Sequence, residues 1–502
     1  MADVRRKMSL SFLLLLLTIS AAAQDVTIQR GCRVGTPRPE GMALRRGAPT
    51  GQKKQTGGDF YYGERHQLTV MVEFNDRAFK GDEDATLAQW NLIFNAKDLK
   101  EPPFKGSVHD YFYAQSYGIF DLDFDLHYVK VPGNAEKYAS TNANDENSQY
   151  LVQDIMEVLS TRHIDWSLYD WNGDGFVNQL LIVYAGNGMN DSSGSNLIWP
   201  HQGWMSEHLK DGKTGVYCDP VSVTYEGKEY KVDCYCALSE LTKNNDYGSF
   251  GTLCHEYTHC FGFPDFYSNT SYVGAWDIMD YGNYNGNGYC PAGYSAHERW
   301  MMGWLTPTEL NKATTVTDMP ALSDESQAYL IRNDGFKDEY YIVENRQQKG
   351  WDESLPGRGI LVFHVDYDSD LWVSTSTYPN TSQKKHYLIF PANNLNFTST
   401  SICKYWAYPY QDNDSLTNTS TPAAILWNAN TDGTKLMNKS VHDIDVTNGL
   451  ASFRFTVDTP TGIEEHTSQQ SAEILYDFGP ISIIRYSNGT IKKVMKHKTQ
   501  NK

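Results

Sequence analysis

The first part of the chain carries hydrophobic patterns of both strands and helices. HQLTVMVEF (66–74) alternates like a strand entering a core, and QLLIVYAG (179–186) is a continuous apolar run typical of a strand buried on both faces. Apolar residues at helical spacing predict a helix over 147–160, and two more are expected over 247–261 and 291–305. This mixture predicts an α/β (α+β) domain with a mixed, twisted sheet.

The pattern changes after residue 308. Short alternating strands then follow one another, separated by Gly, Pro and Asn. They are QAYLIRND (327–334), EYYIVENRQ (339–347), GILVFHVDY (359–367) and SFRFTVD (452–458). We therefore predict an α/β domain over 63–308, a β-rich domain over 309–458 and a C-terminal tail over 459–502.

The N-terminus has the pattern of an export signal. Three basic residues (5–7) precede an apolar run (10–19) and three alanines ending at Ala23. This order predicts a secretory signal peptide over 1–23, and the run is too short to span a membrane. Residues 24–62, rich in Gly, Arg and Pro, are predicted to form a pro-segment or linker. We expect a secreted protein without a transmembrane segment, either extracellular or attached to the cell surface.

Composition narrows the class of partner. Of 502 residues, 40 % are hydrophobic and 21 % are charged, as in a globular protein of two or three domains. The formal net charge of −18 repels phosphate backbones, so nucleic acid is disfavoured as a partner.

The segment CHEYTHCFGFPDFY (254–267) carries the candidate chemistry. His255 and His259 are four residues apart, so both imidazoles share one helical face. A glycine and a proline then end the helix, and Asp265 is placed to return as a third ligand. Two imidazoles and a carboxylate leave one tetrahedral position open, which is typical of a catalytic zinc site. The alternative is an ordinary core helix.

A methionine in a tight turn follows the helix. AWDIMDYGNYNG (275–286) places Met279 among polar and glycine residues. A methionine turn beneath the zinc-binding histidines accompanies HExxHxxGxx-type sites. Taken alone, Met279 would be interpreted as an ordinary core residue. Because it follows the histidine-bearing helix in the sequence, we favour the interpretation as a methionine turn.

These motifs resemble the immune inhibitor A family of bacterial zinc metallopeptidases, relatives of the metzincins with aspartate as third ligand. The resemblance spans about residues 66 to 370 and rests on HEYTHCFGFPDFY, WDIMDYG, SVHDYFYAQSYGIFDLDF, DWNGDGFVNQLLIVYAG, IWPH and EYYIVENRQ...LPGRGILVFHVD. It implies a metzincin-like catalytic domain in a secreted endopeptidase that is made as a zymogen and acts on proteins or peptides.

The site chemistry suggests a mechanism. Zinc lowers the pKa of bound water to about 7 and polarises the scissile carbonyl. Glu256 is placed to act as general base and to pass the proton to the leaving amine. Tyr281, two residues after Met279, is a candidate donor to the oxyanion, as in several metzincin families, and a packed aromatic is the alternative.

A second metal is predicted in DWNGDGFVN (170–178), which resembles the first half of an EF-hand loop. Position 12 is a leucine instead of the bidentate glutamate, so an Asx-rich turn without an ion is the alternative. The candidate Ca²⁺ ligands are Asp170, Asn172, Asp174, the carbonyl of Phe176, and Asn178.

The eight cysteines leave several interpretations open. Cys254 and Cys260 flank the motif and are predicted either to form a disulfide or to remain buried thiols. Cys32, in the predicted pro-segment, is a candidate thiolate latch on zinc, with an ordinary thiol as the alternative. The tail resembles a shortened sorting domain of the type nine secretion system, which would make secretion machinery a partner.

The sequence thus predicts a secreted zinc endopeptidase. One alternative is a non-catalytic, calcium-stabilised adhesion or glycan-binding protein with a vestigial metal site. The other is a zinc hydrolase that acts on bonds other than peptide bonds.

Overall fold

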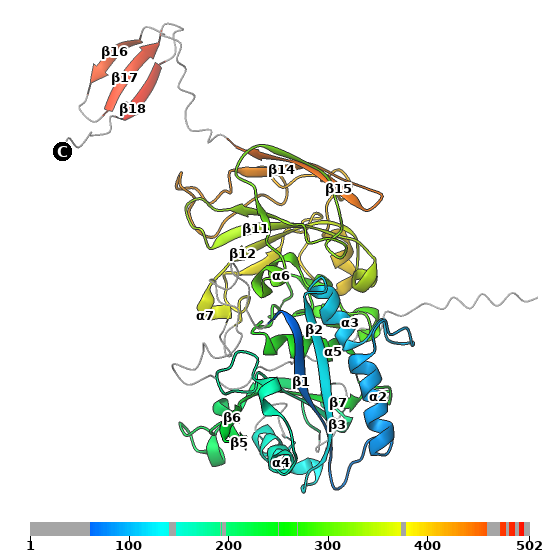
Figure 1. Cartoon of the computed structure of the whole chain (residues 1–502). Helices are drawn as coiled ribbons and strands as arrows, with labels where there is room; N and C mark the ends of the chain where they lie inside the picture. Colours follow the sequence, from blue (N-terminus) through cyan, green and yellow to red (C-terminus); the bar gives the residue numbers. More distant parts are fainter. Residues whose placement is uncertain are drawn as a thin grey trace, which may run out of the picture. The chain divides into compact units, whose positions relative to one another are not determined.

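The structure is a computed structural model (Figure 1) that divides into two compact units, Met1–Val457 and Asp458–Lys502. The predicted signal peptide, nearly all of the predicted pro-segment with Cys32, and much of the tail lie outside the described residues. The described residues are 61–139, 147–190, 192, 197–248, 250–268, 270–372, 378–458, 472–477, 481–486 and 491–495.

The first unit begins with a five-stranded sheet in the order β2-β1-β3-β7-β4. The first four strands in this order are parallel, and β4 runs antiparallel to β7, so the sheet is mixed as predicted. Its strands are β1 (Gly63–Glu73), β2 (Phe120–Lys130), β3 (Leu180–Asn187), β4 (His201–Trp204) and β7 (Cys234–Leu241).

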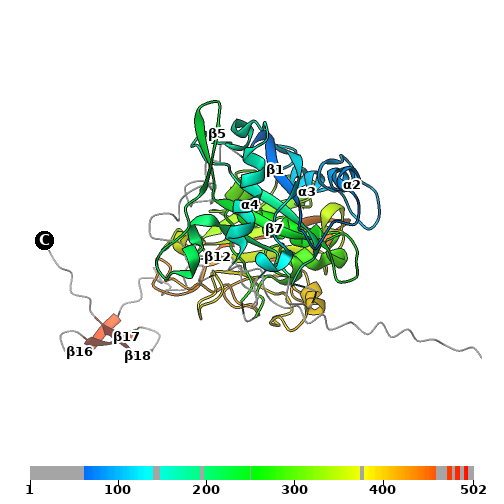
Figure 2. The same ribbon diagram turned by 90° about the horizontal axis from the view of Figure 1, so that it is seen from below.

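Both faces of this sheet are buried. Along β3, Leu181 and Val183 join one core cluster, whereas Leu180 and Ile182 join the other. Helices α2 (Glu83–Asn95), α3 (Val108–Gln115) and α5 (Phe250–Cys260) contribute to the first cluster, and α4 (Ser148–Ser160) contributes to the second. Figure 2, seen from below, shows α4 apart from the α2–α3 pair. The continuous apolar run in β3 is explained by this two-sided burial.

Two further sheets follow residue 308. One has the order β13-β12-β11-β10-β8, and the other has the order β14-β15-β9. Their strands are β8 (Thr308–Glu309), β9 (Thr314–Met319), β10 (Tyr329–Arg332), β11 (Glu339–Arg346), β12 (Gly359–Asp366), β13 (Tyr387–Ile389), β14 (Lys439–Thr447) and β15 (Leu450–Val457).

This strand-rich segment shares a core with the first sheet. Ile342 of β11 and Phe363 of β12 belong to the same buried cluster as Leu181 of β3 and Leu253 of α5. Alternation in the sequence predicted β10, β11, β12 and β15. A separate domain over 309–458 stays a prediction.

Smaller elements complete the fold. They are the hairpin of β5 (Val221–Tyr225) and β6 (Lys228–Val232), and the helices α6 (Ala296–Met302) and α7 (Ser369–Trp372). In the second unit, β16 (Ala472–Asp477), β17 (Ile481–Tyr486) and β18 (Ile491–Met495) form an antiparallel sheet. Among the described residues, no helix combines the length and apolarity needed to cross a membrane.

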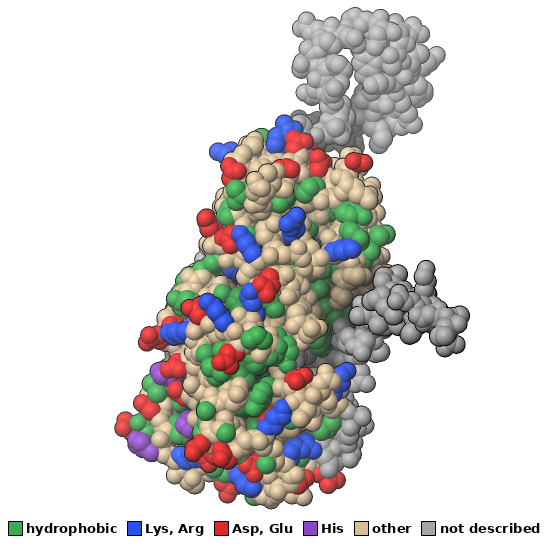
Figure 3. All heavy atoms as spheres, turned by 90° about the vertical axis from the view of Figure 1, so that its right-hand side faces the viewer, with side chains coloured by type: hydrophobic (Ala, Val, Ile, Leu, Met, Phe, Trp, Pro, Cys, Tyr) green, Lys and Arg blue, Asp and Glu red, His purple; other side chains and the backbone are tan. Residues whose placement is uncertain are grey.

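The face in Figure 3 intermixes acidic, basic and apolar side chains. The chain has 43 Lys and Arg residues and 61 Asp and Glu residues. Although acidic residues are in excess, many basic side chains are available to pair with them. Most of the exposed ion pairs that result are worth little to stability, because water and salt screen them.

An ion-pair network centred on Arg346 is buried. Arg346, at the end of β11, is fully buried, and its Nη2 lies 2.7 Å from Asp352 Oδ1 and its Nη1 lies 3.1 Å from Glu344 Oε1. Replacing Arg346 by methionine leaves two buried carboxylates without their counter-charge. We expect the free energy of unfolding to fall by about 3–5 kcal/mol, measured by urea denaturation. The exposed Arg454→Met variant is the control. A loss below about 1 kcal/mol, the scale of a surface pair, would contradict this expectation.

Candidate metal centre

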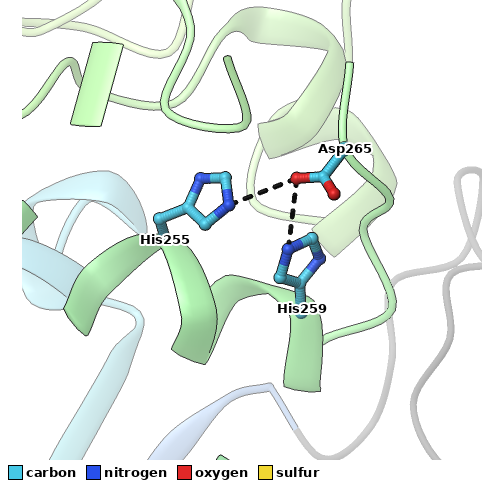
Figure 4. A group of neighbouring side chains, drawn as sticks. All are labelled: His255, His259 and Asp265. Atoms are coloured by element: carbon cyan, nitrogen blue, oxygen red, sulfur yellow. Dashed lines mark ion pairs between the residues drawn. The ribbon is translucent and has the colours of Figure 1, made fainter. Parts of the chain in front are cut away.

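Helix α5 carries two of the three predicted metal ligands. Every residue of α5 is buried, and the helix ends at Cys260. Gly262 follows with φ +93°, a left-handed backbone conformation that glycine adopts without the strain of a side chain. This turn brings the chain back across the C-terminal end of the helix, and Asp265 lies on the returning segment (Figure 4).

The three side chains converge on one point. Asp265 Oδ1 lies 3.2 Å from His255 Nε2 and 3.3 Å from His259 Nε2. All three side chains are buried, and their ligand atoms lie within 4.8 Å of one another. Figure 4 shows both imidazoles directed at the same carboxylate oxygen. The structure thus brings together the three ligands proposed from the sequence.

Backbone carbonyls set the tautomer of both histidines. His255 Nδ1 lies 2.6 Å from the carbonyl of Ile278, and His259 Nδ1 lies 2.7 Å from the carbonyl of Phe263. Since a carbonyl oxygen only accepts, each Nδ1 carries the proton and donates it. In the neutral imidazoles, both Nε2 lone pairs then face Asp265, as metal-ligating histidines do when a carbonyl holds the other ring nitrogen.

The donor set fits a cation. His255 Nε2, His259 Nε2 and both oxygens of Asp265 are buried and have no hydrogen-bond partner among the described residues. Burial raises the pKa of Asp265, whereas positive charge on the two histidines lowers it below its ordinary value. A cation held between the neutral imidazoles and Asp265 would favour the carboxylate form in the same way. Three converging acceptors repel one another unless a positive charge lies between them.

The segment with Met279 supports both ligand-bearing elements. Its carbonyl at Ile278 accepts from His255, and its carbonyl at Met279 accepts from the backbone N–H of Phe266, 2.9 Å away. Met279 itself is fully buried. The turn predicted beneath the histidines thus contacts the helix and the segment after Asp265.

Comparison with known proteins agrees with this geometry. Residues 66–305 match the family described as immune inhibitor A peptidase M6, catalytic domain. This segment belongs to the immune inhibitor A family. The recognition made from sequence motifs is confirmed, and the family supports a metallopeptidase activity. A comparison with curated proteins gave no match.

Two further residues of the immune inhibitor A segment have predicted catalytic roles. Glu256 is fully buried on α5, directly after His255. Tyr281 is partly exposed, and its ring stacks on that of Phe397 at a centroid distance of 5.0 Å and an interplanar angle of 15°. This packing corresponds to the alternative of a packed aromatic, and the oxyanion role of Tyr281 stays a prediction.

The structure gives no support to the predicted calcium loop of the immune inhibitor A segment. Asp170 Oδ2 accepts from the N–H of Gly175 at 3.0 Å and from Lys228 Nζ at 3.1 Å. The lysine ammonium supplies a positive charge to this oxygen of the position-1 carboxylate, whereas the buried Oδ1 of Asp170 has no hydrogen-bond partner among the described residues. Three other bonds lie within the loop: Asp174 Oδ1 accepts from the Phe176 N–H, Asn178 Oδ1 accepts from the Trp171 N–H, and Asn172 donates to Asp174 Oδ2. These bonds are typical of the Asx-rich turn given as the alternative, and the calcium ligands stay a prediction.

A second group of metal-ligating types was not found from the sequence. His66, Asp123 and Asp125 offer ligand atoms within 4.8 Å of one another, because β1 and β2 pair with His66 opposite Asp123. These groups are at least partly exposed, and Asp125 Oδ2 already accepts from Tyr169 at 2.9 Å and lies 3.0 Å from His66 Nδ1. Asp125 and His66 thus have partners within the protein, and only strand register could have revealed that this group comes together.

Cys254 and Cys260 are free, buried thiols in the structure, which is one of the two predicted outcomes. Burial raises the pKa of both thiols well above the ordinary value, so little reactive thiolate forms. We expect iodoacetamide to leave both unmodified in the native protein and to alkylate both after denaturation, as mapped by peptide mass spectrometry. Rapid native alkylation of either thiol, or a disulfide between them, would contradict this expectation.

Proposed function

We propose that the protein is a secreted zinc-dependent endopeptidase with His255, His259 and Asp265 as metal ligands. The observation that carries the proposal is the convergence of three buried acceptor atoms on one point, two of them with tautomers set by backbone carbonyls. The family match independently supports peptide-bond hydrolysis.

Zinc is the proposed ion because two neutral imidazoles and one carboxylate form its usual catalytic ligand set. A zinc ion bound there would polarise the scissile carbonyl and acidify water. The protein's own contribution begins with the carbonyls of Ile278 and Phe263, which hold both imidazoles in one orientation. The turn around Met279 supports this arrangement from beneath, as in metzincins, and we propose a metzincin-like catalytic domain on this basis.

Glu256 is the proposed general base. It follows His255 on a helix that is buried throughout, so its carboxylate is shielded from bulk water. In the proposed mechanism, Glu256 takes a proton from the attacking water and delivers it to the leaving amine nitrogen. One carboxylate therefore serves as base and then as acid within a single hydrolytic cycle.

Secretion is part of the proposal and rests on the N-terminal pattern alone. Export by a cleaved signal would expose the protein to extracellular proteins and peptides as substrates. We also propose that the protein is made as a zymogen and activated after secretion. N-terminal sequencing of protein recovered from the culture medium tests both, since it identifies the first residue of the exported chain.

Proteolysis measured with and without a chelator tests the activity. We expect the purified protein to cleave casein, to lose this activity with a chelator, and to regain it when zinc is added. Lipid and glycan substrates tested in parallel separate the proposal from its rivals. Zinc-dependent turnover of those substrates without casein cleavage would favour the other hydrolase, and inactivity on all three would favour the adhesion protein.

A further inference from the structure

The metal centre has a neighbour outside the family match. Tyr387 is the first residue of β13, an edge strand of the second sheet, and it is fully buried. Its ring and hydroxyl face residues of the immune inhibitor A segment, which ends at residue 305. This contact joins the strand-rich part of the chain to the elements that hold the three candidate ligands.

The phenol of Tyr387 sits in a directed chain of hydrogen bonds. Its oxygen lies 2.9 Å from Ser295 Oγ, and it donates to Asp277 Oδ2 at 3.1 Å. Because a carboxylate only accepts, the single phenol proton is committed to Asp277, and the serine hydroxyl donates to the phenol oxygen. The chain therefore ends on Asp277.

Asp277 organises the turn that contacts the first ligand. Its Oδ1 accepts from the backbone N–H of Met279 at 2.8 Å. Between these two residues lies Ile278, whose carbonyl accepts from His255 Nδ1. Two hydrogen bonds to the Asp277 carboxylate thus connect the phenol of Tyr387 to the turn that orients His255.

The other contacts of Tyr387 reach Phe266, which directly follows the third ligand in the chain. Its ring centroid lies 4.1 Å from that of Phe266, the residue directly after Asp265. Asn380 joins the two backbones: its Oδ1 accepts from the Tyr387 N–H at 3.0 Å, and its Nδ2 donates to the Phe266 carbonyl at 2.8 Å. Tyr387 therefore fixes the segment carrying Asp265 as well as the turn beneath His255.

The geometry points to Tyr387 as a positioning residue of the metal centre, supplied by the strand-rich segment, which fixes the His255–Asp265 separation through Asp277 and Phe266. This inference rests on the proposed function, because it assumes that the separation serves to bind zinc. It assigns the strand-rich segment a direct part in assembling the site.

The electrostatic surroundings explain why the hydroxyl matters. Burial raises the pKa of Asp277, and the hydrogen bonds from Met279 and Tyr387 oppose that rise. Arg346 lowers the pKa of Asp277 and the buried carboxyl of Glu344 raises it, while Asp277 in turn raises the pKa of the buried Glu298. Without the phenol proton, one oxygen of Asp277 loses its donor in a crowded acidic environment, and the turn loses a constraint.

The Tyr387→Phe variant of the full chain isolates the hydroxyl, because the ring and its packing on Phe266 remain. We expect its dissociation constant for Zn²⁺ to rise about 10-fold, the lower end of the effect of removing groups that orient metal ligands. The constant is measured by competition with a chromophoric chelator. The visible absorption spectrum of the Co²⁺-substituted protein is expected to change, since it reports ligand geometry.

Tyr408→Phe is the matched control. Tyr408 is also fully buried in the strand-rich segment, and its hydroxyl has no hydrogen-bond partner among the described residues. We expect this variant to bind Zn²⁺ and to give a Co²⁺ spectrum like the wild type. A structural effect common to buried tyrosines would change both variants alike, whereas positioning changes only Tyr387→Phe.

Asn380→Ala tests the same inference by removing the hydrogen bonds that join Tyr387 to Phe266. If Tyr387→Phe does not fold, this variant provides the test. It is expected to weaken Zn²⁺ binding and to alter the Co²⁺ spectrum. Wild-type affinity and spectrum in Tyr387→Phe, or in Asn380→Ala where that variant decides, would overturn the inference. A wild-type protein that neither binds Zn²⁺ nor cleaves casein would instead overturn the proposed function.

Discussion

Replacing Glu256 by glutamine is expected to lower kcat/KM for casein-derived peptides by at least about 100-fold, while zinc content stays at the wild-type level. Glutamine has nearly the same shape but accepts no proton from water. The three ligands are unchanged, so the loss would fall on proton transfer alone. Steady-state kinetics and metal analysis of the same preparation measure the two quantities.

Glu309→Gln is the control for this substitution. Glu309 lies on β8, and its side chain is 41 % exposed and pairs with Arg332 at the surface. This variant is expected to keep wild-type kinetics. Wild-type activity in Glu256→Gln would contradict the role of Glu256 as general base, and it would leave the assignment of the metal ligands unchanged.

Replacing Asp265 by alanine is expected to weaken zinc binding by more than about 100-fold, since the loss of a direct ligand exceeds the 10–100-fold effect of an outer group. Peptide hydrolysis should disappear with the metal. The substitution removes the carboxylate that both imidazoles face. Competition with a chelator gives the affinity.

The second His–Asp group offers the control. Asp123 belongs to the group with His66 and Asp125, but it is exposed on β2. Asp123→Ala is expected to keep one bound zinc and full activity. If Asp265→Ala kept wild-type affinity and Asp123→Ala lost it, the assignment of the two groups would be reversed.

The candidate metal centre was predictable because its determinants are local. The helix expected over 247–261 is α5, Phe250–Cys260. Its spacing places His255 and His259 on one face, and Gly262 makes the turn that returns Asp265. All of these constraints lie within about three helical turns, where the backbone geometry leaves few alternatives.

Other features depended on long-range packing. The polar positions of the segment 170–178 suggested calcium, and the sequence could not show that Lys228, from a separate hairpin, pairs with Asp170. The stacking of Tyr281 on Phe397 likewise joins distant segments. A local pattern gives the chemical character of a side chain, whereas tertiary contacts determine which groups it meets.

Tyr387 is the clearest case of a residue whose proposed role could not be predicted from the sequence. Its strand is only three residues long, and nothing near it in sequence resembles a catalytic motif. Only the packing of β13 brings its phenol to Asp277 and its ring to Phe266. The shared core of the strand-rich segment and the first sheet is what makes this contact available.

The most direct test of the central claim is X-ray diffraction from crystals of the zinc-loaded protein, recorded on both sides of the zinc absorption edge. We expect a single strong anomalous peak within bonding distance of His255 Nε2, His259 Nε2 and an oxygen of Asp265. An anomalous peak elsewhere, with these three side chains bound to no ion, would contradict the account.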